Sequence, residues 1–237
     1  MIKIDKIDVY GWEAAIRGMR NPMNSWEKSD SGWFSSEDDM GVDYVQYNSH
    51  SDPSELYFVG SNDLDLMTRL RNAGTDHRKF MRMIIVYMDI TAPLYWWKEF
   101  DTYKVGTVAN SCSTMHKIAE KEFTLDDFSH EHLFHNVNDT EIWLNIDFPN
   151  ALDNTIFYLN KARELYLATK DKKYWWQMIQ LLPSSYNQKR TVMLSYEVLA
   201  NIYKSRKNHK LDEWIKLCKT IETLPYQELI TGGKNNG

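Results

Sequence analysis

Cysteine is scarce in this chain. Only Cys112 and Cys218 occur among its 237 residues, and they lie far apart in the sequence. A disulfide framework or a CxxC zinc site needs more cysteines at closer spacing, so we expect neither. So few cysteines are typical of a reducing compartment, and we expect a cytoplasmic protein.

Long apolar runs are also missing. The longest nearly apolar run, 83–88, is far too short to cross a bilayer. Residues 1–5 mix apolar and charged side chains and do not form the apolar region of a secretory signal. We therefore expect no membrane partner.

Positive charge is not in excess. The formal net charge is −5 at pH 7, whereas proteins that bind nucleic-acid polymers usually carry a basic excess. We expect no such polymer as a partner, although a local cluster of Arg and Lys would still hold a small phosphorylated ligand. Aromatic residues are abundant at 14%, with nine Trp, and large rings of this kind supply much of a core's buried area.

Hydrophobic periodicity predicts both helices and strands, and we expect an α+β protein with a central, mostly antiparallel sheet flanked by helices. We predict a single domain over 1–230, with an acidic loop at about 25–61 that carries one or two short strands, and a disordered tail at 231–237. Predicted strands cover 2–9 and 80–90. Predicted helices cover 12–19, 62–74, 93–101, 152–166, 174–182, 185–203 and 211–221.

The polar segment 102–116, predicted to be a loop, is the most informative stretch for function. Residues 102–107 offer a cation, two hydroxyls and a Gly turn, a combination that could meet a phosphate. No P-loop and no GxGxxG motif occurs. Other cations that could serve such a site are Arg78, Lys79, Arg82, Lys98, Lys104, Lys189, Arg190 and Arg206.

Three further groups could carry chemistry. His130, His132 and His135 have a spacing that suits metal ligation, but no partner stands at a diagnostic distance, and a polar loop is the favoured interpretation, with no metal. Cys112 could be a nucleophile with His116 as its base, or a surface thiol. The carboxylates that could act as acid and base, or simply be solvated, are Asp126, Asp127, Glu131 and Asp139.

Taken in order, the segments over roughly 64–221 resemble the flavin-dependent thymidylate synthases. Thr102-Tyr103-Lys104 stands where that family has Arg-His-Arg, and 110–116 stands where it has Asn-Glu-x-Ser-x-Arg-Tyr. Asn110 and Ser113 match the family's Asn and Ser, whereas Ser111, Met115 and His116 replace its Glu, Arg and Tyr. Leu182-Pro183, a following helix and Arg206 keep the order of the family's C-terminal half, but Glu197 stands where it usually has Arg.

The resemblance implies a fold like that of the thymidylate-synthase-complementing proteins, assembled as a homotetramer. It implies a methyltransferase that makes dTMP from dUMP with FAD, NADPH and methylenetetrahydrofolate, in which the flavin carries the hydride chemistry. The implied cofactor-binding residues are Tyr103, Lys104, Asn110 and His116. The implied substrate-binding residues are Ser111, Ser113, Arg190 and Arg206, with Ser113 also catalytic, and Arg78, Arg82 and Lys98 as compensating cations.

Two alternatives stay open. The first is a non-catalytic relative that kept the scaffold and binds a nucleotide or a flavin, which the altered motif favours. The second is an oligomeric interaction protein in which the aromatic runs 95–97 and 174–176 bury a subunit interface.

Overall fold

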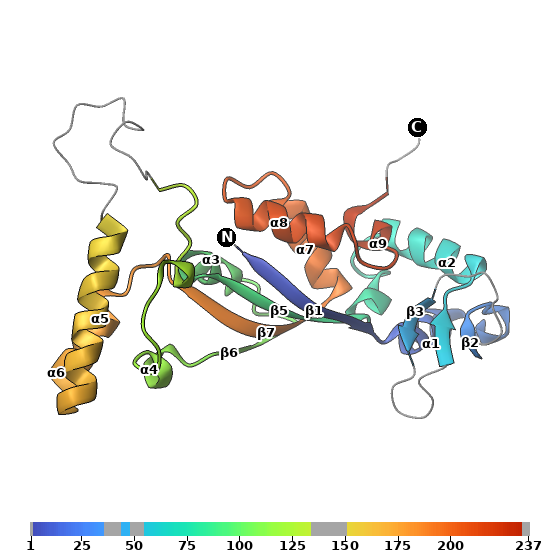
Figure 1. Cartoon of the computed structure of the whole chain (residues 1–237). Helices are drawn as coiled ribbons and strands as arrows, with labels where there is room; N and C mark the ends of the chain where they lie inside the picture. Colours follow the sequence, from blue (N-terminus) through green and yellow to red (C-terminus); the bar gives the residue numbers. More distant parts are fainter. Residues whose placement is uncertain (1, 36–43, 48–54, 134–150, 234–237) are drawn as a thin grey trace. The chain divides into compact units, whose positions relative to one another are not determined.

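The computed structural model describes residues 2–35, 44–47, 55–133 and 151–233 (Figure 1). The chain groups into two compact units. Unit 1 comprises 1–3, 90–102 and 110–190, and unit 2 comprises 4–89, 103–109 and 191–237. A single domain over 1–230 stays a prediction. Most of the predicted disordered tail, 234–237, lies outside the described residues, while the short helix α9 spans Glu228–Thr231.

A four-stranded sheet runs through the chain in the order β1-β5-β7-β6. Its strands are β1 (Lys3–Tyr10), β5 (Ile85–Pro93), β6 (Thr107–Ser111) and β7 (Asn187–Ser195). The predicted class, α+β with an antiparallel sheet flanked by helices, is confirmed. Along β5 the side chains at 86, 88, 90 and 92 are all fully buried, because alternate residues of a strand point to one face.

The strand predicted at 80–90 begins later than expected. Residues Lys79–Arg82 form a 3-10 turn that buries Phe80 and Met81, and β5 follows it. A short apolar run is buried in either conformation, so composition alone did not locate the start of the strand.

The long helix predicted over 185–203 is wrong in its first half. Residues Asn187–Ser195 form β7, and helix α7 (Tyr196–Arg206) begins only after Ser195, whose hydroxyl accepts the N–H of Val198 at 3.3 Å. Val192 and Leu194 are buried with a less buried residue between them, which is the period of a strand. Apolar residues of β7 and α7 together have a helical spacing, but the pairing of β7 within the sheet overrides it.

The segment 102–116 is not one loop. It contains the edge strand β6 and a single helical turn, α4 (Thr114–Lys117), capped by Ser113. Four of the five β6 side chains are exposed, so the strand leaves no hydrophobic pattern in the sequence. Gly106 has φ +78°, a conformation that glycine adopts at little cost, and it turns the chain into β6.

The predicted acidic loop holds a small sheet. Strands β2 (Gly32–Ser35), β4 (Glu55–Phe58) and β3 (Tyr44–Tyr47) pair antiparallel in the order β2-β4-β3. One or two short strands were expected in this loop, at about 42–47 and 55–59, which β3 and β4 match, whereas β2 was not expected. Residues 36–43 and 48–54 lie outside the described residues.

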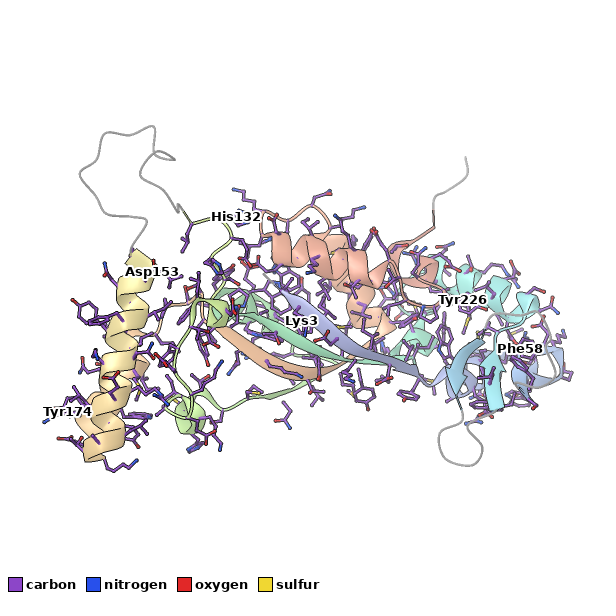
Figure 2. The ribbon with its side chains drawn as sticks, viewed as in Figure 1. Lys3, Phe58, His132, Asp153, Tyr174 and Tyr226 are labelled. Atoms are coloured by element: carbon purple, nitrogen blue, oxygen red, sulfur yellow. The ribbon has the colours of Figure 1, made fainter. Side chains whose placement is uncertain are left out.

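The remaining helices divide between the units. Unit 2 has α1 (Trp12–Arg20), α2 (Ser61–Asn72) and α8 (Asp212–Ile221), close to their predicted ranges, and its core includes fully buried Trp12, Tyr196 and Trp214. Unit 1 has α3 (Leu94–Phe100), α5 (Ala151–Thr169) and α6 (Lys172–Leu181). Figure 2 shows Asp153 and Tyr174 at opposite ends of the α5–α6 pair. No helix in the described ranges is both long and apolar enough to cross a membrane.

In the aromatic run 95–97 the two Trp rings lie in the chain's own core, so they do not supply the subunit interface that one alternative above expected. Trp96 and Trp97 are 0% and 1% exposed inside the chain's own core. The second run differs, because Trp176 is 42% exposed.

Asp63, at the start of α2, is a fully buried carboxylate. It accepts hydrogen bonds from Arg20 Nε at 2.6 Å, from the hydroxyls of Ser29 and Ser31 at 2.6 and 2.7 Å, and from two backbone N–H groups. Burial alone would raise the pKa of Asp63, but the hydrogen bonds from Ser29, Ser31 and Arg20 outweigh burial and lower it. This carboxylate therefore fastens 29–31 to α2.

We predict that Asp63→Asn lowers the free energy of unfolding by about 3 kcal/mol, because it leaves the buried Arg20 guanidinium without its counter-charge. Since the folded pKa lies below the unfolded value, this contribution is complete above the unfolded pKa and is lost as the pH falls through the folded pKa. Urea unfolding between about pH 7 and pH 3 measures both effects. Asp65→Asn, which removes an exposed pair with Arg69, should change stability by less than about 0.5 kcal/mol. An equal loss in both variants would contradict this role for Asp63.

Candidate functional site

The turn at 112–114 is held by strand β7. The Cys112 N–H donates to the Lys189 carbonyl at 3.0 Å, which extends the pairing beyond the end of β6. The Gln188 amide nitrogen donates to the Cys112 carbonyl at 3.0 Å and to the Thr114 hydroxyl at 3.1 Å. Ser113, between these two anchors, accepts the N–H of His116 at 3.2 Å. The predicted motif residues therefore stand on a fixed turn.

Arg190 holds the side chain of Gln188 by a hydrogen bond. Its Nε donates to Gln188 Oε1 at 3.0 Å, and its Nη1 pairs with Asp101 at 2.7 Å. The guanidinium also lies 4.2 Å from the centre of the Trp97 ring, whose Nε1 donates to the Gln188 carbonyl at 2.8 Å. Asp101 and Trp97 hold the Arg190 guanidinium in place. Through its hydrogen bond to Oε1, Arg190 in turn orients the Gln188 amide toward the turn.

A cavity of about 590 Å³ lies beside this turn. Its wall includes the thiol of Cys112, the hydroxyls of Ser113 and Thr114, and both ends of two ion pairs, Lys117–Glu120 and Lys121–Asp127. Lys189 also lines it. Two of the three lysines in the wall are thus balanced by carboxylates of the same wall.

Tyr103 and Arg206 meet within unit 2. Arg206 Nε donates to the Tyr103 hydroxyl at 2.9 Å, and its guanidinium lies 4.7 Å from the centre of the buried Trp214 ring. Cation–π contact and the hydrogen bond together fix both side chains. Lys104, the next residue after Tyr103, is exposed.

Glu197 neutralises two of the predicted compensating cations. Its carboxylate, 9% exposed, pairs with Arg78 at 3.3 Å and with Arg82 in a short contact. Burial raises the pKa of Glu197, but the hydrogen bonds and charges of Arg82 and Arg78 outweigh burial and lower it. At this position, where the sequence resemblance expects Arg, the chain thus has an acid that binds cations of the same chain.

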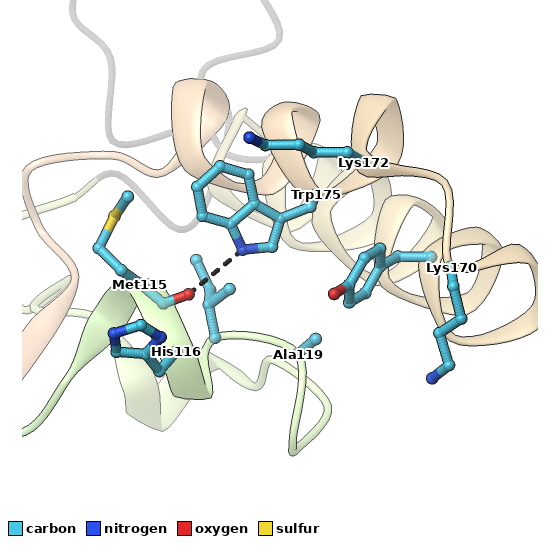
Figure 3. A pocket seen from close by; sticks show the side chains of 8 residues that line it. Met115, His116, Ala119, Lys170, Lys172 and Trp175 are labelled. Atoms are coloured by element: carbon cyan, nitrogen blue, oxygen red, sulfur yellow. Dashed lines mark hydrogen bonds between the residues drawn. The ribbon is translucent and has the colours of Figure 1, made fainter.

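The other predicted residues are more scattered. Lys98 is exposed on α3, and Asn110 and Ser111 are exposed on β6. His116 and Met115 line a separate hollow beside α4 (Figure 3). Tyr103, Lys104, Arg78, Arg82 and Arg206 belong to unit 2, whereas 110–116, Lys98 and Arg190 belong to unit 1.

The histidine cluster shows no metal geometry within the described ranges. No three His, Cys, Asp or Glu side chains come together there as metal ligands, and His135, like Asp139, lies outside those ranges. His130 Nδ1 is 3.0 Å from the Phe128 carbonyl. The Asp127 carboxylate accepts the N–H of Thr124, the residue that caps the turn Leu125–Asp127, so this carboxylate has a structural role.

Sequence reasoning missed Gln188 and Asp101. Gln188 was placed in a predicted helix, where it could not face 112–114, and only strand pairing brings it there. Asp101 gave no local signal, since its partner Arg190 is 89 residues away.

Comparison with known proteins gives the fold. No family model matches the chain, and no curated protein matches it in sequence. A flavin-dependent thymidylate synthase (ThyX) from Helicobacter pylori, solved with FAD and dUMP, superposes with a TM-score of 0.63 at 16% identity, covering 98% of this chain and 97% of that one. A second structure of the H. pylori enzyme with the same ligands gives a TM-score of 0.59 at 16% identity, covering 96% and 97%.

A third structure belongs to a UMP/dUMP methylase, PolB, from Streptomyces cacaoi, bound to 5-bromo-dUMP. It has a TM-score of 0.54 at 12% identity and covers 94% of this chain and 89% of that one. At these identities the likeness establishes the fold. The chain therefore has a thymidylate-synthase-like fold over nearly its whole length.

We predict that the two thiols differ sharply in reactivity. Cys112 is exposed, whereas Cys218 is buried. Burial, and to a lesser extent the charge of Glu222, raise the pKa of the Cys218 thiol to about 11. Because the thiolate is the nucleophile, Cys112 should react with the disulfide reagent DTNB at least roughly a hundredfold faster at pH 8. Cys112→Ser should abolish the fast phase and Cys218→Ala should keep it. Two fast thiols would contradict the burial of Cys218.

We predict that Glu197→Gln lowers the free energy of unfolding by about 2 kcal/mol, because the buried acceptor of Arg78 and Arg82 loses its charge. Since the folded pKa of Glu197 is depressed, the difference between the two proteins should vanish as the pH falls through that folded value. Urea unfolding at a series of pH values measures this. Glu120→Gln, which removes an exposed pair, is the control. A difference that persisted at low pH would show that charge is not the cause.

Proposed function

We propose that this chain binds dUMP or a closely similar deoxyuridine nucleotide on its thymidylate-synthase-like scaffold. The supporting observation is the end-to-end likeness to proteins solved with such ligands: dUMP in two structures and 5-bromo-dUMP in the third. These proteins were all solved with a ligand of this class, although the Helicobacter protein is named a thymidylate synthase and the Streptomyces protein a UMP/dUMP methylase.

We place the nucleotide in the cavity beside the 112–114 turn. Its volume of about 590 Å³ falls within the range of small-molecule sites. Ser113 and Thr114 offer hydroxyls to the ligand, and Lys189 offers a charge to a phosphate. Arg190 acts through Gln188 as a positioning residue, while its direct contact with dUMP, like that of Ser111 and Arg206, stays a prediction.

Flavin-dependent methyl transfer is the second candidate, with dUMP converted to dTMP by FAD, NADPH and methylenetetrahydrofolate. It is favoured because the Helicobacter structures hold both FAD and dUMP. The residues at the implied flavin position fit an FAD diphosphate poorly. The Tyr103 hydroxyl already binds Arg206, and Lys104 is the single cation among 102–104. We therefore place nucleotide binding before flavin chemistry, with Asn110 and His116 as further cofactor residues if the flavin binds.

An oligomeric interaction protein is the third candidate. Helices α5 and α6 expose large apolar side chains, including Phe157, Tyr158, Leu165 and Trp176. An oligomer, in particular the homotetramer implied by the resemblance, would bury such side chains. For all three candidates we propose a cytoplasmic location.

Nucleotide binding can be tested at Cys112, which lines the proposed site. We expect dUMP to bind by calorimetry and to slow the fast reaction of Cys112 with DTNB in a saturable manner. Ser113→Ala should weaken dUMP binding by roughly tenfold, the loss of one hydrogen bond to a charged or polar ligand group. Ser205→Ala, on the exposed side of α7, is the matched control. No calorimetric binding would overturn the proposal, and binding that left Cys112 reactive would exclude this cavity.

The flavin candidate has its own test. The visible absorbance spectrum is recorded before and after FAD is added and the protein is desalted. A retained flavin spectrum that is lost in Lys104→Ala would support the candidate and justify an assay for dTMP. Absence of retained flavin after saturation would end it without affecting the proposal for dUMP.

A further inference from the structure

A second hollow, of about 450 Å³, lies where α4 and the two residues after it face the α5–α6 pair (Figure 3). We call it the α4–α6 hollow. Its functional lining is Met115, His116, Tyr166, Lys170, Lys172 and Trp175, completed by two aliphatic side chains. All of these residues belong to unit 1.

The hollow has a rigid aromatic wall. Trp175 Nε1 donates to the Met115 carbonyl at 3.2 Å, the dashed line in Figure 3, so the indole is fixed to the α4 turn. Trp175 and Tyr166 also pack partly against the core of this unit, around Leu159 and Met178. Two rings and the Met115 side chain thus form a surface onto which a planar ring could stack without reorganising the helices.

The charge in the hollow is of one sign. Its two ionised side chains are Lys170 and Lys172, and no Asp or Glu lines it. Asp171, between them, instead accepts the Lys173 N–H at 2.9 Å and pairs with the Lys173 ammonium at 3.0 Å. Within the part of the chain that the structure describes, neither Lys170 nor Lys172 pairs with a carboxylate.

Both lysines are held over aromatic rings. Lys170 Nζ lies 5.8 Å from the Tyr166 ring centre, and Lys172 Nζ lies 6.0 Å and 5.6 Å from those of Trp175 and Trp176. A cation–π contact leaves the ammonium N–H groups able to bind an anion. The nucleotide cavity differs, because Glu120 and Asp127 balance two of its lysines.

We propose that the α4–α6 hollow is a second binding site, separate from the nucleotide cavity, for a small molecule with a planar aromatic ring and a carboxylate or phosphate. The ring lies against Trp175 and Tyr166, and the anion meets the ammonium group of Lys172 beside Trp175 or that of Lys170 beside Tyr166, which lie on opposite sides of the hollow (Figure 3). The site does not depend on the proposed binding of dUMP, which we place beside Ser113.

Calorimetry with 2-naphthoate tests the ring and the charge together. We expect saturable binding, with 2-naphthalenemethanol, which lacks the charge, and acetate, which lacks the ring, each binding at least about fivefold more weakly. Running 2-naphthyl phosphate in parallel distinguishes a phosphate ligand from a carboxylate ligand, and binding of either supports the site. Equal binding of the charged and uncharged naphthalenes would overturn the role of the lysines.

The double variant Lys170→Asn with Lys172→Gln should weaken 2-naphthoate binding at least about fivefold. Asn suits position 170 because Lys170 has φ +58°, a region that Asn tolerates. The matched control is Lys161→Gln with Lys207→Gln, because these lysines also lie over rings, those of Phe157 and Tyr203, but outside the hollow. Equal weakening in both double variants would overturn the assignment to this hollow.

Competition separates this site from the nucleotide cavity. Saturating dUMP should leave the affinity for 2-naphthoate unchanged, whether or not dUMP itself binds. Displacement of 2-naphthoate by dUMP would place both in one site and overturn the proposal of a second one.

Discussion

The pairing of β7 with β6 is the constraint on which the candidate site depends. It sets the Lys189 carbonyl against the Cys112 N–H and carries Gln188 to the 112–114 turn. Gln188 is in turn oriented by Arg190, which Asp101 and Trp97 hold. A short polar turn with little core of its own is thereby fixed through a strand some 75 residues further along the chain. Preorganisation of this kind is what a small-ligand site needs, because a loose turn would lose entropy on binding.

Internal pairing decides which charges remain for a ligand. Arg78 and Arg82 share Glu197, Arg190 binds Asp101, and two lysines of the nucleotide cavity bind carboxylates in its wall. A cation count from the sequence therefore overstates the positive charge available to a phosphate. The same accounting favours a monophosphate ligand over the diphosphate of FAD. It also explains how Glu197 can stand where the resembling family usually has Arg, since its charge is satisfied within the chain.

Aromatic residues serve two purposes in this fold. Trp12, Trp96, Trp97 and Trp214 are buried and fill the core, as the high aromatic content predicted. Others lie at the surface of α5 and α6 with lysines above them. The first group stabilises the fold through buried area, whereas the second presents rings and charge together to a ligand. Composition counts both groups alike, and only burial separates them.

The sequence by itself determined the α+β class, the helices α1, α2 and α8, and strand β1, because each carries its own periodic pattern or local breaker residues. The order of its segments also resembles the thymidylate synthases, and the comparison with solved structures shows a fold of that kind. The tertiary structure alone decided that 187–195 is a strand and that 107–111 is its exposed partner, since cross-strand hydrogen bonds between distant residues override local spacing. It alone also decided the partners of Arg190, Glu197 and Lys172, because ion pairs and ring contacts depend on proximity in space and leave no trace in the spacing of residues.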